Sequence, residues 1–152
     1  MAKVPNIRQV YFYQVPPARV FSALTEPKEL AKWFPSDAEV QLEKGGKFVL
    51  RFGKEFAMKG KVKKAKAPGR LTLSWIDKIG NKTVKTTADF TLERKNGGTL
   101  LTLTHSGFGS GKRAVWLYGA IQSGWAYYLT NLRSVLEHGI DLRSEHDAVS
   151  GN

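Results

Sequence analysis

The sequence predicts an α+β fold in which a seven-stranded antiparallel sheet wraps on one long C-terminal helix. Three observations support this expectation. Apolar and polar residues alternate with a period of two over most of residues 40–106, which is typical of half-buried strands. Turn residues such as Gly45-Gly46 and Pro68-Gly69 separate the alternating segments at hairpin spacing. From about Lys112, apolar residues recur every three or four positions, as in an amphipathic helix.

The N-terminal part predicts one strand and two short helices. Residues 7–15 are rich in β-branched and aromatic side chains and stop at Pro16-Pro17, so they predict the first strand. One short helix is expected from Pro17 and a second after Thr25-Glu26-Pro27, because proline suits the first turn of a helix. Pro35 is expected to end the second helix. The two helices would form a bent hairpin across an open sheet.

Six further strands are expected in hairpin order, so that neighbours run antiparallel. Each has one apolar and one polar face. The residues that define the apolar faces are Val40 and Leu42; Phe48, Leu50 and Phe52; Phe56, Met58, Gly60 and Val62; Leu71, Leu73 and Trp75; the alternating run from Val84 to Leu92; and Leu101, Leu103 and His105.

The C-terminal helix is expected to contain roughly 27 residues, which makes it about 40 Å long. Gly139 stands where a left-handed cap would end it. Residues 144–152 are polar, and a frayed tail is expected there. The length of 152 residues and the lack of an interior linker predict a single domain, 1–152, with its core at about 7–138.

The formal net charge of +11 is unevenly distributed. Two interpretations stay open for a basic stripe between residues 44 and 70. It could attract phosphates, anionic lipid or an acidic protein, or it could keep the solvent face of a strand pair soluble. The three nearby phenylalanines share the parity of the apolar face, so no specific nucleic-acid binding is expected. The stripe consists of Lys44, Lys47, Arg51, Lys54, Lys59, Lys61, Lys63, Lys64, Lys66 and Arg70, with one acid, Glu55.

Several classes of chemistry are not indicated. The chain has no cysteine, and its histidines, His105, His138 and His146, lack metal-ligand spacing. There is no nucleophile elbow, phosphate-binding loop or dinucleotide fingerprint. We therefore expect no metal, no cofactor and no assigned catalytic residue. The N-terminus has no apolar run of signal-peptide length, and no stretch approaches a membrane span, so a cytoplasmic protein is expected.

An ordered series of short motifs resembles a known family. By this series the chain is similar to the START-like (SRPBCC) superfamily, whose helix-grip fold is also that of Bet v 1-like proteins. Within this superfamily, the motifs resemble the branch named after the activator of heat-shock protein 90 ATPase. The resemblance covers about residues 7–138. The matching stretches are Val15 to Pro27, Leu30, Trp33-Phe34, Gly45-Gly46-Lys47-Phe48, Pro68 to Trp75, Leu101 to Phe108 and Gly124-Trp125.

The chain departs from the family pattern in two respects. The family's glycine pair usually follows a proline, where this chain has Lys44. The eukaryotic activator also has a separate N-terminal domain with an Asn-Trp-His-Trp-type signature, which this sequence does not show. The resemblance therefore supports the fold more than it supports chaperone activation.

The helix-grip resemblance implies a cavity, because a curved sheet gripped by one helix is hard to fill completely. The alternative is an ordinary packed core. His105 shares the inward parity of its strand and could enter the cavity mouth as a proton carrier or hydrogen-bond donor, or be a satisfied histidine at a strand end. The candidate cavity residues are Trp33, Phe34, Phe48, Phe52, Met58, Trp75, Phe90, His105, Phe108, Ile121, Trp125 and Tyr128.

Three functions follow from these observations. The first is binding of a small apolar or amphiphilic molecule between the sheet and the C-terminal helix. The second is a co-chaperone-like interaction module that uses the basic stripe against an acidic protein. The third is a cyclase- or hydrolase-like enzyme, which requires a buried acid or base in the cavity, whereas Asp89 and Glu93 have outward parity. The glycines between Gly107 and Gly111 suggest a hinge on which the helix could open the cavity.

Overall fold

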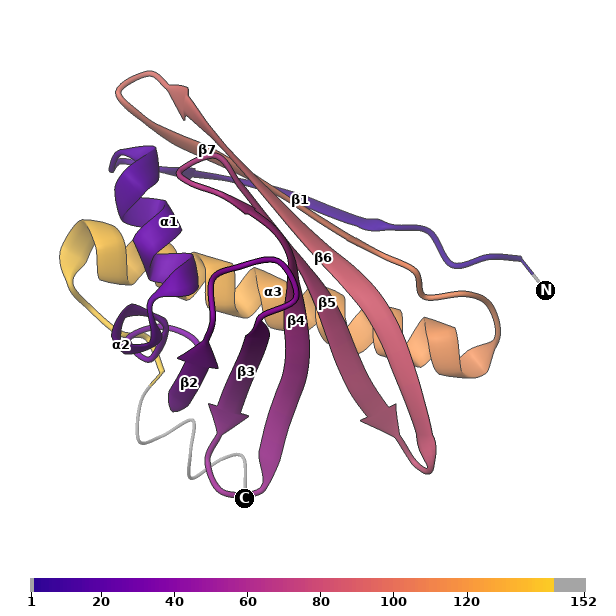
Figure 1. Cartoon of the computed structure of the whole chain (residues 1–152). Helices are drawn as coiled ribbons and strands as arrows, with labels where there is room; N and C mark the ends of the chain where they lie inside the picture. Colours follow the sequence, from indigo (N-terminus) through magenta and orange to yellow (C-terminus); the bar gives the residue numbers. More distant parts are fainter. Residues whose placement is uncertain (1, 144–152) are drawn as a thin grey trace.

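The computed structural model describes residues 2–143 of the chain (Figure 1). The expected tail at 144–152, which includes His146, lies outside the described residues. The expected fold class is confirmed: an antiparallel sheet of seven strands, two short helices after the first strand, and one long helix. The elements are β1 (Ile7–Tyr13), α1 (Pro17–Thr25), α2 (Pro27–Leu30), β2 (Asp37–Val40), β3 (Lys47–Phe52), β4 (Phe56–Lys66), β5 (Arg70–Ile79), β6 (Lys82–Lys95), β7 (Gly98–Ser106) and α3 (Lys112–His138).

The strands form one sheet in the order β1-β7-β6-β5-β4-β3-β2. Strands β2 to β7 are neighbours in both sequence and space, whereas β1 returns to pair with β7, with Ile7 opposite His105. Helix α3 runs across the inner face of this curved sheet, and α1 and α2 lie near its C-terminal end (Figure 1). The two short helices therefore cover only one end of the sheet.

Two element ends differ from the prediction near the N-terminus. Strand β1 ends at Tyr13, because the carbonyl oxygen of Val15 accepts a hydrogen bond from the Thr99 hydroxyl (2.7 Å) in place of a ladder bond. Helix α2 contains only residues 27–30, and Trp33 follows it in a turn. Its indole is still buried, and its Nε1 donates to the carbonyl oxygen of Ala23 (2.8 Å).

Strand β2 is also shorter than expected. It ends at Val40, and Leu42 lies outside it with 43% of its surface exposed. The cause is the turn that follows, in which a Cβ on Gly46 would collide with the carbonyl oxygen of Gln41. The chain leaves the sheet here because the Gly45-Gly46 turn needs this close backbone approach.

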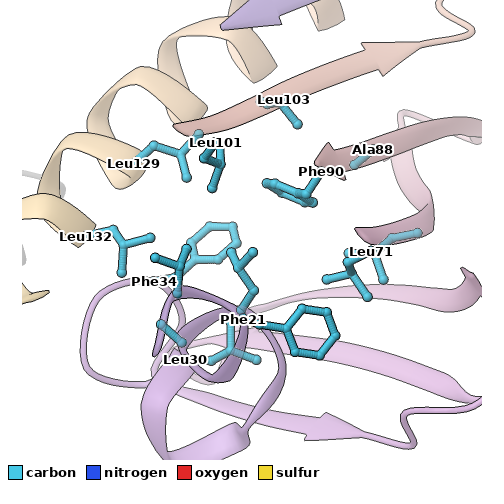
Figure 2. Close-up of a cluster of buried hydrophobic side chains, with 14 of the residues drawn as sticks. Phe21, Leu30, Phe34, Leu71, Ala88, Phe90, Leu101, Leu103, Leu129 and Leu132 are labelled. Atoms are coloured by element: carbon cyan, nitrogen blue, oxygen red, sulfur yellow. The ribbon is translucent and has the colours of Figure 1, made fainter. Parts of the chain in front are cut away.

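The packed core lies where α1 and α2 meet the sheet and the second half of α3 (Figure 2). Helix α1 and the segment from α2 to β2 contribute apolar side chains from one side, and β5, β6, β7 and α3 contribute them from the other. The residues labelled in Figure 2 are Phe21, Leu30, Phe34, Leu71, Ala88, Phe90, Leu101, Leu103, Leu129 and Leu132.

Polar bonds attach α3 to the edge strand β1. The hydroxyl of Tyr13 donates to the carbonyl oxygen of Leu129 (2.8 Å). The guanidinium of Arg133 donates to the carbonyl oxygen of Phe12 through Nη2 (2.8 Å) and Nε (3.1 Å). These bonds join one side of the sheet to the second half of α3, and they fix the line along which the helix crosses the sheet.

Glycines define both ends of α3. Gly139 has a φ of 69°, and its N–H donates to the carbonyl oxygen of Val135 (3.0 Å), so the expected left-handed cap is confirmed. Before the helix, Gly109 has a φ of 80°, and its carbonyl oxygen accepts a bond from the N–H of Val4 (2.7 Å). The backbone conformation thus explains this glycine without a hinge, and gating by α3 stays a prediction.

Candidate functional site

A pocket of about 440 Å³ lies between the first half of α3 and the inner face of β3, β4 and β5. Its lining is predominantly aromatic and aliphatic. It opens to solvent at a rim where Phe56 and Trp116 are 51% and 63% exposed. The lining residues are Phe34, Phe52, Phe56, Met58, Trp75, Asp77, Lys78, Ile79, Trp116, Leu117, Ala120, Ile121, Gly124, Trp125 and Tyr128.

The pocket brings together seven of the twelve candidate cavity residues: Phe34, Phe52, Met58, Trp75, Ile121, Trp125 and Tyr128. The other five do not line it. Trp33, Phe48 and Phe90 are buried in the packed core, because α1 and α2 fill that end of the sheet. His105 and Phe108 lie behind the pocket wall and are considered below.

Small residues on α3 leave room for the pocket. Ala120 and Gly124 lie in its lining one turn apart on the helix. A Cβ built on Gly124 would meet no heavy atom within 4 Å, so the space beside this glycine is open. Larger side chains at these two positions would occupy the volume that now faces β4 and β5.

Phe34 lies at the centre of a cluster of rings that line the pocket. Its ring centroid is 4.7 Å from that of Tyr128, 5.3 Å from Trp125 and 5.4 Å from Phe52. The backbone here is also held, because Arg143 Nη1 donates to the carbonyl oxygen of Phe34 (2.8 Å). Phe34 belongs to both the packed core and the pocket lining, as do Trp75 and Trp125, so these rings lie where the core meets the pocket.

His105 is a satisfied core histidine, and the idea that it enters the cavity mouth as a proton carrier is wrong. It is fully buried. Its Nδ1 accepts a hydrogen bond from Trp125 Nε1 (3.0 Å), and its Nε2 lies 2.7 Å from the hydroxyl oxygen of Thr86. This pattern assigns the proton to Nε2, and the Thr86 hydroxyl then donates to the carbonyl oxygen of Trp75 (3.4 Å). Burial lowers the pKa of His105 to about 3, so the ring is neutral at pH 7.

Phe108 belongs to a second, smaller cluster and not to the pocket. It packs with Ile7, Ala114 and Leu117, and its ring lies 5.3 Å from that of His105 in a stacked arrangement. Its position in the chain explains this, because it follows β7 and precedes α3. Phe108 therefore anchors the connection between the sheet and the helix.

Asp77 is the functional candidate that the sequence analysis missed. It follows Leu73 and Trp75 at the inward parity of β5, and it lines the pocket. Its Oδ2 is buried and has no hydrogen-bond partner among residues 2–143. Burial raises the pKa of this carboxyl group above its ordinary value. The period-two alternation of inward residues in β5 places Asp77 on the inward face, and this pattern could have identified it.

Asp89 and Glu93, the two acids with outward parity, do not line the pocket. Asp89 contacts Arg70 on the outer face (Oδ1 to Nε, 3.2 Å), and Glu93 is exposed. Asp77 is thus the pocket carboxyl that the enzyme interpretation requires. The described lining residues include no serine, threonine, cysteine or histidine that could act beside it as nucleophile or base.

In β4, three lysines of the basic stripe lie on the opposite face of the strand from the residues that line the pocket. Lys59, Lys61 and Lys63 are exposed, while Met58 and Val62 of the same strand are buried. These three lysines form no ion pair within the described part of the chain. These three lysines therefore lie on the solvent face of the sheet, opposite the face that lines the pocket.

Neither a metal-binding cluster nor a membrane-spanning helix is found among the described residues. Between residues 2 and 143, no group of three or more histidine, aspartate and glutamate residues is arranged to hold a metal ion. Within the same range, the helices are too short or too polar to cross a bilayer.

A seven-stranded antiparallel sheet that grips one long helix defines a helix-grip protein of the START-like superfamily. Residues 14–137 match the family model described as "Activator of Hsp90 ATPase homolog 1-like protein", and the chain belongs to this family. The search of curated proteins gave no match.

Solved structures share this fold. Protein MLL2253 from Mesorhizobium loti is 19% identical with a TM-score of 0.79, and the match covers 90% of this chain and 99% of that one. An Hsp90 activator from Plasmodium falciparum is 26% identical (TM-score 0.71; 86% and 95% covered). CalU16 from Micromonospora echinospora is 27% identical (TM-score 0.68; 96% and 80% covered).

Proposed function

We propose that the protein binds a small apolar or amphiphilic molecule in the pocket between α3 and strands β3 to β5. The observation that supports this is the pocket itself. Its volume of about 440 Å³ falls within the range of roughly 300–1,000 Å³ that is usual for small-molecule sites. Burial of an apolar ligand against its aromatic wall would supply the binding free energy.

The test is to fill the pocket without disturbing the core. Gly124→Leu places a side chain in the open space beside α3, and it should weaken binding of the neutral fluorescent hydrocarbon diphenylhexatriene at least tenfold. Gly119→Leu is the matched control, because this glycine is exposed on the same helix, also has open space around it and does not line the pocket. Both changes raise helix propensity equally.

Probe affinity is read from the fluorescence increase on titration, and circular dichroism checks that each variant is folded. Equal probe affinity in Gly124→Leu and wild type would reject the pocket as the binding site. Trp125→Ala should also reduce probe uptake. This variant removes the donor to His105 Nδ1, however, so its effect on probe affinity is confounded by an effect on the stability of the fold. Native mass spectrometry of protein purified from its own host would then identify the bound molecule.

A second function is favoured by family membership and by the exposed lysines of the basic stripe. An Hsp90 activator is 26% identical to this chain, and a positive surface would attract an acidic partner protein. If the stripe acts in this way, Lys59→Glu combined with Lys61→Glu should abolish stimulation of the ATPase of the host's own Hsp90-type chaperone, whereas Gly124→Leu should leave it unchanged. Absence of stimulation by the wild-type protein would reject this second function.

A further inference from the structure

One wall of the pocket is not apolar. Asp77 projects from the inward face of β5 into a lining formed mainly by rings and aliphatic side chains, and its Oδ2 is buried without a hydrogen-bond partner among residues 2–143. It forms no ion pair within that range, although Lys78 follows it in the strand and also reaches the pocket lining. A carboxyl oxygen in this situation loses its hydration and gains nothing in return.

Burial is the cause of the raised pKa of Asp77, and no charge among residues 2–143 contributes to this shift in pKa. A ligand that brings a positive charge or a strong donor to Oδ2 would compensate the lost hydration and favour the ionised carboxylate. Apart from Lys78, the lining suits a cation as well, because Trp75, Trp116 and Tyr128 are the ring types whose faces attract ammonium groups.

We infer that the ligand is a cationic amphiphile, an apolar chain or ring system with an ammonium group that lies against Asp77. This inference rests on the proposed small-molecule function and specifies its ligand class. The apolar body would occupy the space beside Ala120 and Gly124, and the ammonium would lie between the Asp77 carboxylate and the aromatic rings. The charge-assisted hydrogen bond to Oδ2 would fix the orientation of the ligand.

The net charge of the protein opposes the binding of a cation. With a formal net charge of +11, long-range attraction favours anionic ligands and disfavours cations. At physiological salt, exposed charges are screened over about 8 Å, whereas a buried contact is screened much less. A preference for a cation must therefore arise locally, at Asp77.

The experiment compares three ligands of equal chain length as competitors for bound diphenylhexatriene: decylamine, decanol and decanoate, at pH 7 and 0.15 M salt. Wild type should bind decylamine about tenfold more tightly than decanol, which corresponds to one charge-assisted hydrogen bond. Decanoate should bind most weakly, despite the positive net charge.

Asp77→Asn keeps the size of the side chain and removes its charge, so decylamine and decanol should then bind within about twofold of each other. Asp89→Asn is the matched control, because it removes a carboxylate from the outer face that is already paired with Arg70. This control should retain the tenfold preference. Circular dichroism checks that both variants are folded.

A wild-type protein that binds decylamine no more tightly than decanol would overturn the inference, as would a preference that survives in Asp77→Asn. If decanol and the probe bind and Gly124→Leu weakens both, such a result rejects only the cationic ligand class. If neither decanol nor the probe binds wild type, the proposed function fails and this inference fails with it.

Discussion

Acid is expected to destabilise the protein through His105. Burial lowers the pKa of this histidine from an ordinary 6.5 to about 3. Between these values the unfolded chain binds a proton that the folded chain does not, so the free energy of unfolding falls as the pH falls. The contribution is fully present above pH 6.5. Integrated from pH 7 to pH 5, the loss from this single group is about 2 kcal/mol.

The assay is urea unfolding followed by circular dichroism, for wild type and His105→Gln at both pH values. Glutamine keeps an acceptor for Trp125 Nε1 and a donor for the Thr86 hydroxyl, but it does not titrate. Wild type should therefore lose about 2 kcal/mol more than the variant on acidification. Asp77, whose pKa is raised by burial, acts in the opposite sense, but it is present in both proteins and its effect cancels.

His138→Gln is the matched control, since it removes a histidine from the chain and leaves His105 in place. It should retain the loss of about 2 kcal/mol that His105 causes between pH 7 and pH 5. If His105→Gln and wild type lose the same amount, the assignment of a neutral, buried His105 is refuted.

Two further predictions concern α3 and the basic stripe. Gly119→Ala should raise the free energy of unfolding by about 0.5–1 kcal/mol, since its Cβ would meet no atom within 4 Å and alanine favours a helix. Gly46→Ala should lower the free energy of unfolding, because its Cβ would collide with the Gln41 carbonyl oxygen. Urea unfolding measures both, and a less stable Gly119→Ala would contradict the expectation. The basic stripe should not retain the protein on DNA at about 0.2 M salt, where roughly six to ten phosphate contacts lose several orders of magnitude in affinity. Retention on a DNA column at that salt would contradict the interpretation as a solubility face.

The fold could be predicted because period-two alternation and turn residues agree along most of the sheet. In β4 the buried residues Met58, Gly60 and Val62 alternate with exposed lysines, as the sequence predicts. Strand ends were harder to predict, since they depend on partners far away in sequence. Val15 leaves the ladder because of Thr99, a residue 84 positions later.

The candidate site could be predicted only in part, because parity shows which face a residue occupies but not what covers it. Phe48 and Phe52 lie on the same face of β3, yet Phe48 is in the packed core and Phe52 lines the pocket. The difference is the position of α1 and α2 along the sheet, which no local pattern specifies. Asp77 was not predicted for another reason: apolar and aromatic side chains define the inward face of a strand, and an acid at inward parity breaks that pattern.

Helix α3 has different roles along its length, and this follows from where α1 and α2 lie. Its second half meets these short helices and the sheet, so Leu129 and Leu132 are fully buried. Its first half has no such cover, and there Ala120 and Gly124 leave a space that the side chains of β4 and β5 do not fill. The same helix therefore supplies core packing at one end and a pocket wall at the other. Substitutions in the first half of α3 that alter ligand preference can therefore have little effect on stability. Truncating Leu129 or Leu132 in the second half, in contrast, leaves a buried cavity that typically costs about 2–5 kcal/mol.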